Sequence, residues 1–214
     1  MKKVILNGLG TIGASVIEAL PEMDLLGIVN DELEIGSTQG KYKKIPVIGH
    51  LKDLPKLIKP DDVFLIITYR DMKNERNQWE QLKTLNIPQD KYINVIHPSV
   101  IIPSNYCTIG KGVFMAPNVQ LSTEITISNN CVFYGNSFIG HNTIIDEFVI
   151  VANHASIGAR VKIGKGVHIG SNSTIREGVT VGEFSLIGLG SVVLNDIPKN
   201  SIVAGVPAKI IGTK

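Results

Sequence analysis

The sequence predicts an α/β domain over residues 1–97, followed by a parallel β-helix over residues 98–214. Two observations predict this division. In the first part, short apolar runs alternate with segments whose apolar residues recur at helical spacing. In the second part, an apolar residue recurs at every sixth position from Ile109 to Val193. One chain therefore combines two different periodicities.

The first part reads as strands alternating with helices. The predicted strands are residues 3–7, 25–30, 45–49, 62–68 and 92–96, and the predicted helices are residues 11–20, 50–58 and 71–86. Such alternation is typical of a parallel sheet with helices on its faces, because each parallel crossover needs a connecting segment. The sequence therefore predicts a small Rossmann-like unit.

The second part has a strict period of six. Fifteen positions are all apolar: Ile109, Met115, Leu121, Ile127, Phe133, Ile139, Ile145, Val151, Ile157, Ile163, Ile169, Ile175, Val181, Ile187 and Val193. With 43% hydrophobic residues, chance gives such a run roughly once in 10⁵–10⁶ trials. The residue two places before each is small or β-branched.

This period predicts how the chain coils. Six residues make one short strand and a turn, and three such sides close a coil of 18 residues. Coils stack about 4.8 Å apart, so residues 18 apart lie above one another. The segment gives about five coils. Cys107 and Cys131 fall on inward small positions, so we expect them to be buried thiols without a disulfide framework.

Charge and hydropathy exclude several classes of function. A net charge of +2 argues against nonspecific nucleic-acid binding as the main activity. Arg160, Lys162, Lys165 and Arg176 lie in or beside a stretch without acids, a field suited to an anionic ligand. No apolar stretch approaches the length of a membrane-spanning helix, and the start "MKKVILNGLG" reads as a strand rather than a signal peptide. We expect a cytoplasmic protein.

The repeat resembles that of the hexapeptide-repeat acyltransferases, and "GVPAK" near the end matches a segment that closes many of them. A Rossmann-like half joined to such a repeat is similar to the branch with nucleotide-amino-sugar N-acetyltransferases and sialic acid O-acetyltransferases. The resemblance implies a left-handed β-helix, a homotrimer and acetyl-CoA as cosubstrate. It also implies an acceptor amino sugar linked to UDP or dTDP, for surface glycans such as lipopolysaccharide.

The same resemblance implies that His141 is the catalytic base. "IGHNTIIDEF", residues 139–148, matches the family's motif, except that Asn142 stands where relatives commonly carry an acid. Asparagine orients the imidazole without adding charge, so we expect a weaker base, which fits an amine acceptor better than a hydroxyl. Ala159, one coil above His141, would offer its backbone N–H to the oxyanion.

The other histidines have structural interpretations. Asn118, Asn136, His154 and Asn172 lie 18 apart, so we expect His154 to be a turn residue with a left-handed backbone. His168 is expected to lie exposed on a face, and His50 and His97 in loops.

Coenzyme A should follow the β-helix axis, with contacts at 18-residue spacing. The base of its groove would be formed by Ala152, Gly170 and Gly188, unless these small residues serve only to let coils stack. The residues that would line the groove or bind its phosphates are Asn153, Ser171, Leu189, Lys209 and the basic stretch 160–165. In the family this groove lies between subunits.

The first part carries a glycine motif, "NGLGTIG", between a predicted strand and a predicted helix. Alone it suggests a dinucleotide site, whereas the resemblance implies a nucleotide-linked sugar. The implied contacts are Gly8, Gly10, Thr11, Asn30, Asp31 and Thr68. Ile12 and Thr68 depart from the family's usual residues, which leaves the sugar, the base and tight nucleotide binding open.

Three alternatives to the amino-sugar N-acetyltransferase remain. One is an O-acetyltransferase for sialic acid or a related sugar, and another is a scaffold without catalysis. The third is a γ-carbonic-anhydrase-like metalloenzyme, which needs converging histidines. The intervals between His141, His154 and His168 are 13 and 14 residues, which match neither a coil nor a short pair. We therefore expect no metal site.

Overall fold

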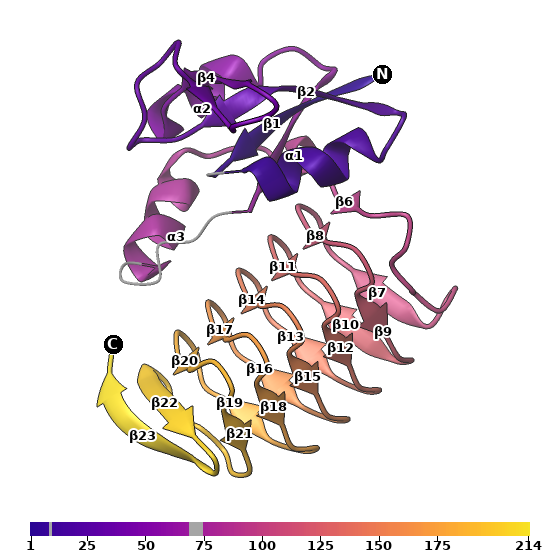
Figure 1. Cartoon of the computed structure of the whole chain (residues 1–214), viewed down its shortest axis with the longest axis vertical. Helices are drawn as coiled ribbons and strands as arrows, with labels where there is room; N and C mark the ends of the chain where they lie inside the picture. Colours follow the sequence, from indigo (N-terminus) through magenta and orange to yellow (C-terminus); the bar gives the residue numbers. More distant parts are fainter. Residues whose placement is uncertain (9, 69–74) are drawn as a thin grey trace. The chain divides into compact units, whose positions relative to one another are not determined.

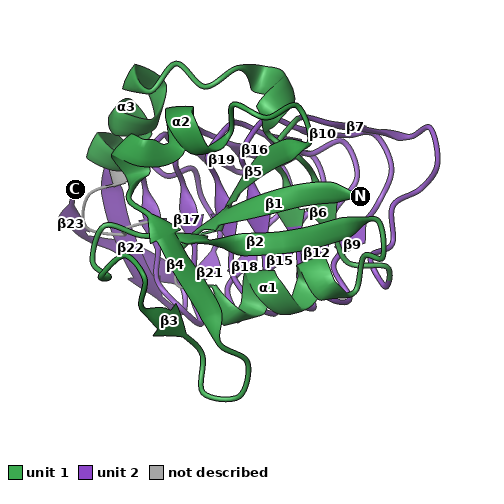
Figure 2. Cartoon of the chain, turned by 90° about the horizontal axis from the view of Figure 1, so that it is seen from above, with its two compact units in different colours: residues 1–98, 111–114 green, residues 99–110, 115–214 purple. Residues whose placement is uncertain are grey.

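The computed structural model describes residues 1–8, 10–68 and 75–214, which form two compact units. The first consists of residues 1–98 and 111–114, and the second of residues 99–110 and 115–214 (Figure 2). None of the helices in these ranges is both long and apolar enough to cross a membrane.

A five-stranded sheet forms the centre of the first unit, in the order β3-β4-β2-β1-β5. The strands are β1 (Lys2–Asn7), β2 (Met23–Val29), β3 (Thr38–Gln39), β4 (Ile45–Gly49) and β5 (Val63–Ile67). All neighbours are parallel except β3 and β4. The helices are α1 (Thr11–Glu18), α2 (Leu54–Leu57) and α3 (Glu75–Thr84), with 3₁₀ turns η1 (Leu51–Asp53) and η2 (Gln89–Lys91).

The predicted elements of this unit are present with shifted ends. The strand predicted over 92–96 is reduced to β6 (Val95–Ile96), and Tyr92 makes an isolated bridge to Leu65 of β5. The short hairpin strand β3 is not predicted from the sequence. Residues 71–74 of the predicted third helix lie outside the described residues.

Fifteen short strands, β7 to β21, form the coils of the β-helix (Figure 1). They are β7 (Cys107–Ile109), β8 (Phe114–Met115), β9 (Gln120–Leu121), β10 (Ile125–Ile127), β11 (Val132–Phe133), β12 (Phe138–Ile139), β13 (Ile144–Ile145), β14 (Ile150–Val151), β15 (Ser156–Ile157), β16 (Lys162–Ile163), β17 (His168–Ile169), β18 (Thr174–Ile175), β19 (Thr180–Val181), β20 (Leu186–Ile187) and β21 (Val192–Val193). Each ends on one of the fifteen apolar residues predicted to point inward.

The strands stack in three parallel sheets, one for each side of the coil. Their orders are β19-β16-β13-β10-β7, β21-β18-β15-β12-β9 and, for the third, β20-β17-β14-β11-β8. Thr126 pairs with Ile144, and Ile144 with Lys162, so the register advances by 18 residues per coil. The predicted stacking of side chains 18 apart is confirmed. The stack continues through β22 (Ser201–Gly205) into an antiparallel β23 (Ala208–Thr213).

Left-handed residues mark the corners of each coil. One corner contains Asn118, Asn136, His154, Asn172 and Gly190, all with φ between 58° and 67°. The second contains Glu124, Asn142, Arg160 and Gly178, and the third Gly112, Asn130, Phe148, Gly166 and Phe184. Asparagine and glycine tolerate this backbone best. His154 is therefore a turn residue, as predicted.

Glycines next to the inward aliphatic residues let the coils approach one another. A Cβ added to Gly140 would lie 2.6 Å from the Ala159 nitrogen in the coil above, and one added to Gly170 would lie 2.6 Å from the Leu189 nitrogen. Inward small positions such as Val149 and Cys131 are fully buried, as expected, whereas Cys107 in the first coil is only partly buried. The β-helix core is thus closely packed, and its outer corners stay in fixed positions.

Candidate active site

His141 lies exposed at a corner, in the turn between β12 and β13. Its Nδ1 is 2.8 Å from the Asn142 side-chain oxygen. An amide oxygen accepts a hydrogen bond, so this contact favours the tautomer with the proton on Nδ1. Nε2 then carries the free lone pair. The corner presents a proton acceptor on a rigid scaffold.

Asn142 has a backbone reason to be there as well as a chemical one. It occupies a left-handed corner position with a φ of 57°. Asparagine tolerates this conformation well. The side chain that shapes the turn is the same one that orients the imidazole. Asn142, which stands where relatives commonly carry an acid, can therefore both form the turn and orient His141.

Ala159 lies directly above His141 in the next coil. The Arg160 N–H donates to the His141 carbonyl oxygen at 2.8 Å, which fixes the position of the intervening turn. Within the described ranges, the Ala159 N–H has no acceptor. Gly140 has no Cβ to obstruct the Ala159 nitrogen. A backbone donor is therefore held one coil away from the imidazole.

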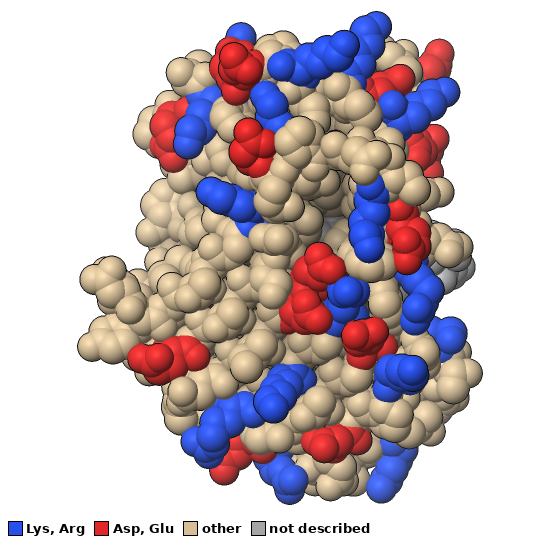
Figure 3. Space-filling model, turned by 180° about the vertical axis from the view of Figure 1, so that it is seen from behind, with Lys and Arg blue, Asp and Glu red and all other residues tan. Residues whose placement is uncertain are grey.

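Two of the basic residues near this corner are paired with acids from other coils. Arg160 forms an ion pair with Glu177 at 3.0 Å, and Lys165 with Glu147 at 3.1 Å. The acid-free stretch in the sequence therefore does not produce an acid-free surface. Basic and acidic side chains are interspersed on the face drawn in Figure 3. Neither Arg160 nor Lys165 is an unpaired partner for a coenzyme phosphate.

The residues predicted to contact coenzyme A lie at a different corner. Asn153, Ser171 and Leu189 stack there, since the Asn172 N–H donates to the Asn153 carbonyl at 3.0 Å and the Gly190 N–H donates to the Ser171 carbonyl at 2.8 Å. Leu189 is 81% exposed, unusual for so large an apolar side chain. One face of the β-helix, the sheet from β9 to β21, separates this corner from His141.

Lys209 lies near the end of the neighbouring column, which contains Ala152, Gly170 and Gly188. Gly188 packs against the coil above, where an added Cβ would lie 3.0 Å from the Ala204 Cβ. Ala204 of β22 pairs with Lys209 of β23. The exposed Lys209 ammonium is thus carried beside the column of Ala152, Gly170 and Gly188. Close coil contact explains both glycines, which leaves the groove interpretation of this column open.

In the first unit, polar residues gather where three neighbouring strands end. Asn7, Asn30 and Thr68 follow or end β1, β2 and β5, and they are only 5–6% exposed. The Asn7 amide nitrogen donates to the Val29 carbonyl oxygen at 3.2 Å, whereas its side-chain oxygen has no partner among the described residues. Open α/β sheets bind ligands at such an edge. Sequence reasoning missed Asn7, although an asparagine ending an apolar strand is a detectable signal.

The other predicted nucleotide contacts have structural partners. The Asn30 side-chain oxygen accepts from the Glu32 N–H at 2.7 Å, and an Asp31 oxygen accepts from the Leu51 N–H at 2.7 Å. Gly10 leaves room for Leu6, because an added Cβ would collide with its side chain. Gly8 has a φ of 148°, and Thr11 begins α1 with its side chain exposed. Leu9, inside the motif, is not among the described residues.

The expectation that His168 lies exposed is wrong. It stands on the outer side of β17 between Ile150 and Leu186, and its Nδ1 is buried without a partner in the described parts of the chain. Burial, aided by the positive charge of Lys214, lowers the pKa of His168 to about 4. In the ranges described, no three His, Cys, Asp or Glu side chains are grouped to hold a metal ion.

Comparison with known proteins agrees with this architecture. Residues 160–195 match the family model "Bacterial transferase hexapeptide (six repeats)". No curated protein matches the chain. Among solved structures, a histidine-to-asparagine mutant of perosamine N-acetyltransferase from Caulobacter crescentus, in complex with CoA and GDP-perosamine, has a TM-score of 0.82 at 23% identity. The match covers 99% of this chain and 98% of that one.

A second solved structure is similar over the same extent. The acetyltransferase domain of PglB from Neisseria gonorrhoeae has a TM-score of 0.80 at 24% identity, covering 99% of this chain and all of that one. In its complex with acetyl coenzyme A, the same domain has a TM-score of 0.79. Together with the repeat match, these likenesses show the left-handed β-helix fold of hexapeptide-repeat acyltransferases, as predicted.

Proposed function

We propose that this protein is an acetyl-CoA-dependent N-acetyltransferase whose acceptor is an amino-deoxy sugar linked to a nucleotide. The observation that carries the proposal is the corner at which His141, oriented by Asn142, lies beneath the free N–H of Ala159. The similar structures support it, since one is a complex with CoA and GDP-perosamine and another a complex with acetyl coenzyme A. The product would serve the assembly of a surface glycan such as lipopolysaccharide.

The corner supplies two of the groups that acyl transfer needs. The acceptor amine attacks the thioester carbonyl carbon, and His141 Nε2 takes the proton that the nitrogen loses. Negative charge develops on the carbonyl oxygen, to which the Ala159 N–H donates. The tetrahedral intermediate then expels the coenzyme thiolate, which receives the proton from His141. Neutral Asn142 leaves the imidazole a modest base, sufficient for an amine.

The nucleotide would bind at the strand ends of the first unit. The polar edge formed by Asn7, Asn30 and Thr68, with Gly8, Gly10 and Thr11 beside it, supports this assignment. Asp31 would act there indirectly, because its carboxylate caps the η1 turn. UDP, dTDP and GDP are the candidate nucleotides, the last because a similar structure holds a GDP-linked sugar.

A single chain does not complete the proposed acetyl-CoA site, which supports a homotrimer. His141 and Ala159 share one corner, whereas Asn153, Ser171 and Leu189 share another. If the coenzyme lies between subunits, one subunit supplies the base and its neighbour supplies the groove. Phe138, 42% exposed, and Ile144, 48% exposed, flank His141 and provide apolar surface for such an interface.

The nearest alternative is acetylation of a sugar hydroxyl, as in the sialic acid O-acetyltransferases. Asn142 argues for the amine, because a hydroxyl needs a stronger base than an imidazole without a carboxylate partner. A metal-dependent hydratase is less favoured, because His141 and His154 stand at different corners and His168 is buried on a face.

The test incubates the full chain with acetyl-CoA and a panel of UDP-, dTDP- and GDP-linked amino sugars, each paired with its hydroxyl analogue. Mass spectrometry of the nucleotide sugars and release of free coenzyme thiol are both measured. We expect a gain of one acetyl group on an amino sugar and none on its hydroxyl analogue. Acetylation of the hydroxyl analogues alone would favour the O-acetyltransferase, and release with no acceptor modified would overturn both.

A further inference from the structure

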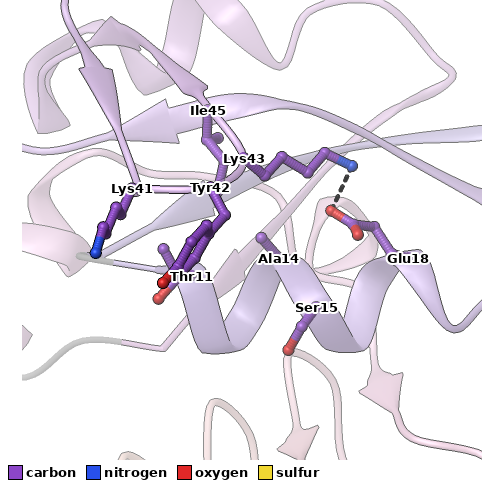
Figure 4. A pocket seen from close by; sticks show the side chains of 9 residues that line it. Thr11, Ala14, Ser15, Glu18, Lys41, Tyr42, Lys43 and Ile45 are labelled. Atoms are coloured by element: carbon purple, nitrogen blue, oxygen red, sulfur yellow. Dashed lines mark ion pairs between the residues drawn. The ribbon is translucent and has the colours of Figure 1, made fainter.

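A pocket of about 350 Å³ lies in the first unit, between one side of α1 and the loop that joins β3 to β4 (Figure 4). Thr11, Ala14 and Glu18 line it from the helix, and Lys41 and Tyr42 from the loop. Thr11 also belongs to the proposed nucleotide site, so the pocket adjoins it. Nothing in the catalytic proposal uses the loop.

The two ends of the pocket differ in charge. At one end, Lys43 is neutralised by an ion pair with Glu18 at 2.6 Å. At the other end, Lys41 has no acidic partner within the described ranges; its Nζ lies 5.1 Å from the centre of the Tyr42 ring. Residues 40–44 contain three lysines and no acid. The open end therefore favours an anionic ligand.

Tyr42 is presented to solvent in a defined way. Its side chain is 92% exposed, and both Tyr42 and Thr11 line the pocket (Figure 4). The turn that carries it is fixed by Gly40, whose φ is 96° and where an added Cβ would collide with the Lys43 carbonyl oxygen. An aromatic ring next to a lysine that has no acidic partner in the described parts of the chain suits a ligand with both a flat ring and negative charge.

We infer that this loop is the part of the nucleotide-sugar site that recognises the nucleoside diphosphate. Tyr42 stacks on the nucleobase, and Lys41 binds the diphosphate, with the Thr11 hydroxyl on the same side. The inference rests on the proposed function for the identity of the ligand. It adds two recognition residues that lie outside the glycine motif and the acidic strand end.

Isothermal titration of the full chain with UDP, dTDP and GDP, in the absence of acetyl-CoA, tests the inference. For the nucleotide that binds best, we expect Tyr42→Ala to weaken binding about tenfold, the effect of losing one base stack, and Tyr42→Phe to bind within about twofold of the wild type. Lys41→Ala should also weaken binding about tenfold, and less so in high salt.

Two exposed positions supply matched controls. Lys44→Ala removes a lysine of the same loop that does not line the pocket, and Tyr106→Ala removes a half-exposed tyrosine of the second unit. Both should bind nucleotide like the wild type. Because all these side chains are exposed, the variants should keep the thermal unfolding midpoint of the wild type.

The outcomes separate this inference from the proposed function. Tyr42-dependent nucleotide binding without acetyl transfer to any sugar would overturn the function and keep the inference. Acetyl transfer with Tyr42→Ala and Lys41→Ala unchanged in nucleotide affinity and KM would overturn the inference and keep the function. Failure of all three nucleotides to bind would also overturn it.

Discussion

At the scale of single residues, Asn142 combines a backbone role with a chemical role. Its left-handed φ of 57° is a conformation that asparagine tolerates better than most residues, and its amide oxygen lies 2.8 Å from His141 Nδ1. Glycine fits the same backbone, as Gly178 does two coils above, but has no acceptor. Substitution at this position therefore separates the two roles.

Asn142→Gly should keep the fold and lower kcat about tenfold, equivalent to the loss of one orienting hydrogen bond.

Asn142→Asp should keep turnover and move the acidic limb of the kcat/KM profile to higher pH, because a carboxylate raises imidazole basicity. Steady-state kinetics between pH 5 and 9 measure both. Unchanged kcat in Asn142→Gly would mean that the amide does not orient His141.

His168 makes a prediction about stability rather than activity. Burial lowers its pKa in the folded chain to about 4, below the unfolded value of 6.5. The unfolded chain thus binds the extra proton between these values, so stability falls as the pH drops from about 6.5 towards 4, by up to about 3 kcal/mol.

The variant His168→Leu should remove this loss, since leucine matches the neighbouring Ile150 and Leu186 in the column. Urea unfolding at pH 7 and pH 5 measures the effect. We expect the variant to gain stability relative to the wild type as the pH falls. Parallel curves for the two proteins would show that His168 is not the group that titrates.

Prediction from sequence at this scale succeeded where the period of 18 fixes a position. His154 was placed at a left-handed corner from its ladder of asparagines, and the structure agrees. It failed for His168, because the period gives the face on which a residue lies but not what covers that face. The sequence analysis missed Asn7, Lys41 and Tyr42. Their proposed roles depend on which residues surround them in the folded chain, and spacing in the sequence does not give that information.

At the scale of elements, each β-helix corner has a first turn position, which is the residue immediately before the left-handed one. Pro117 occupies this first position at another corner, before the left-handed Asn118. Ala159 precedes Arg160 in the same way. Proline is therefore compatible with the position of Ala159, although it has no N–H.

This equivalence gives a test of the oxyanion donor. Ala159→Pro should fold normally and lose about 10²–10³ in kcat, as when one such donor is removed from an enzyme. Ala159→Ser, which keeps the N–H, is the matched control and should retain most of its activity. Circular dichroism checks the fold. Turnover by Ala159→Pro equal to that of the serine variant would rule out the backbone donor.

The elements of the two units were predictable to different degrees. All fifteen strands of the β-helix end on the residues that the period selects, because each coil repeats the same packing. In the first unit, helices and strands were found but their ends moved, since caps and pairing partners decide them. β3 carries no strong pattern, whereas β4 was predicted, and the loop between them presents Tyr42.

At the scale of the whole molecule, the proposed acetyl-CoA site needs a second copy of the chain. The base and the proposed coenzyme residues lie at different corners, so variants of the two sets should complement each other in mixed oligomers. His141→Ala removes the base, and Ser171→Trp fills the groove. Each site of a mixed oligomer takes one residue from each of two subunits.

Either variant alone should be nearly inactive. Refolded together in equal amounts, they should regain about one quarter of the wild-type activity. A site works only if its base comes from a Ser171→Trp chain and its groove from a His141→Ala chain, and each of these has a probability of about one half. Activity is measured after the oligomer size is checked by sedimentation. No recovery in a verified mixed oligomer would show that one chain holds the whole site, contrary to the assembly proposed.

Neither the assembly nor the acceptor was derivable from the chain's own periodicity. The 18-residue stacking fixes where His141 stands, but it does not specify which surface lies opposite that corner in an assembly. The resemblance to hexapeptide-repeat acyltransferases implies the coenzyme and the trimer, and the separation of the two corners supports the proposal that two chains share one site.

The most direct test of the central claim is the kcat of His141→Ala with the best nucleotide-linked amino sugar at saturating acetyl-CoA. We predict a loss of about 10²–10⁴ relative to the wild type, with acetyl-CoA affinity unchanged by titration. Turnover close to that of the wild type would contradict the assignment of His141 as the base.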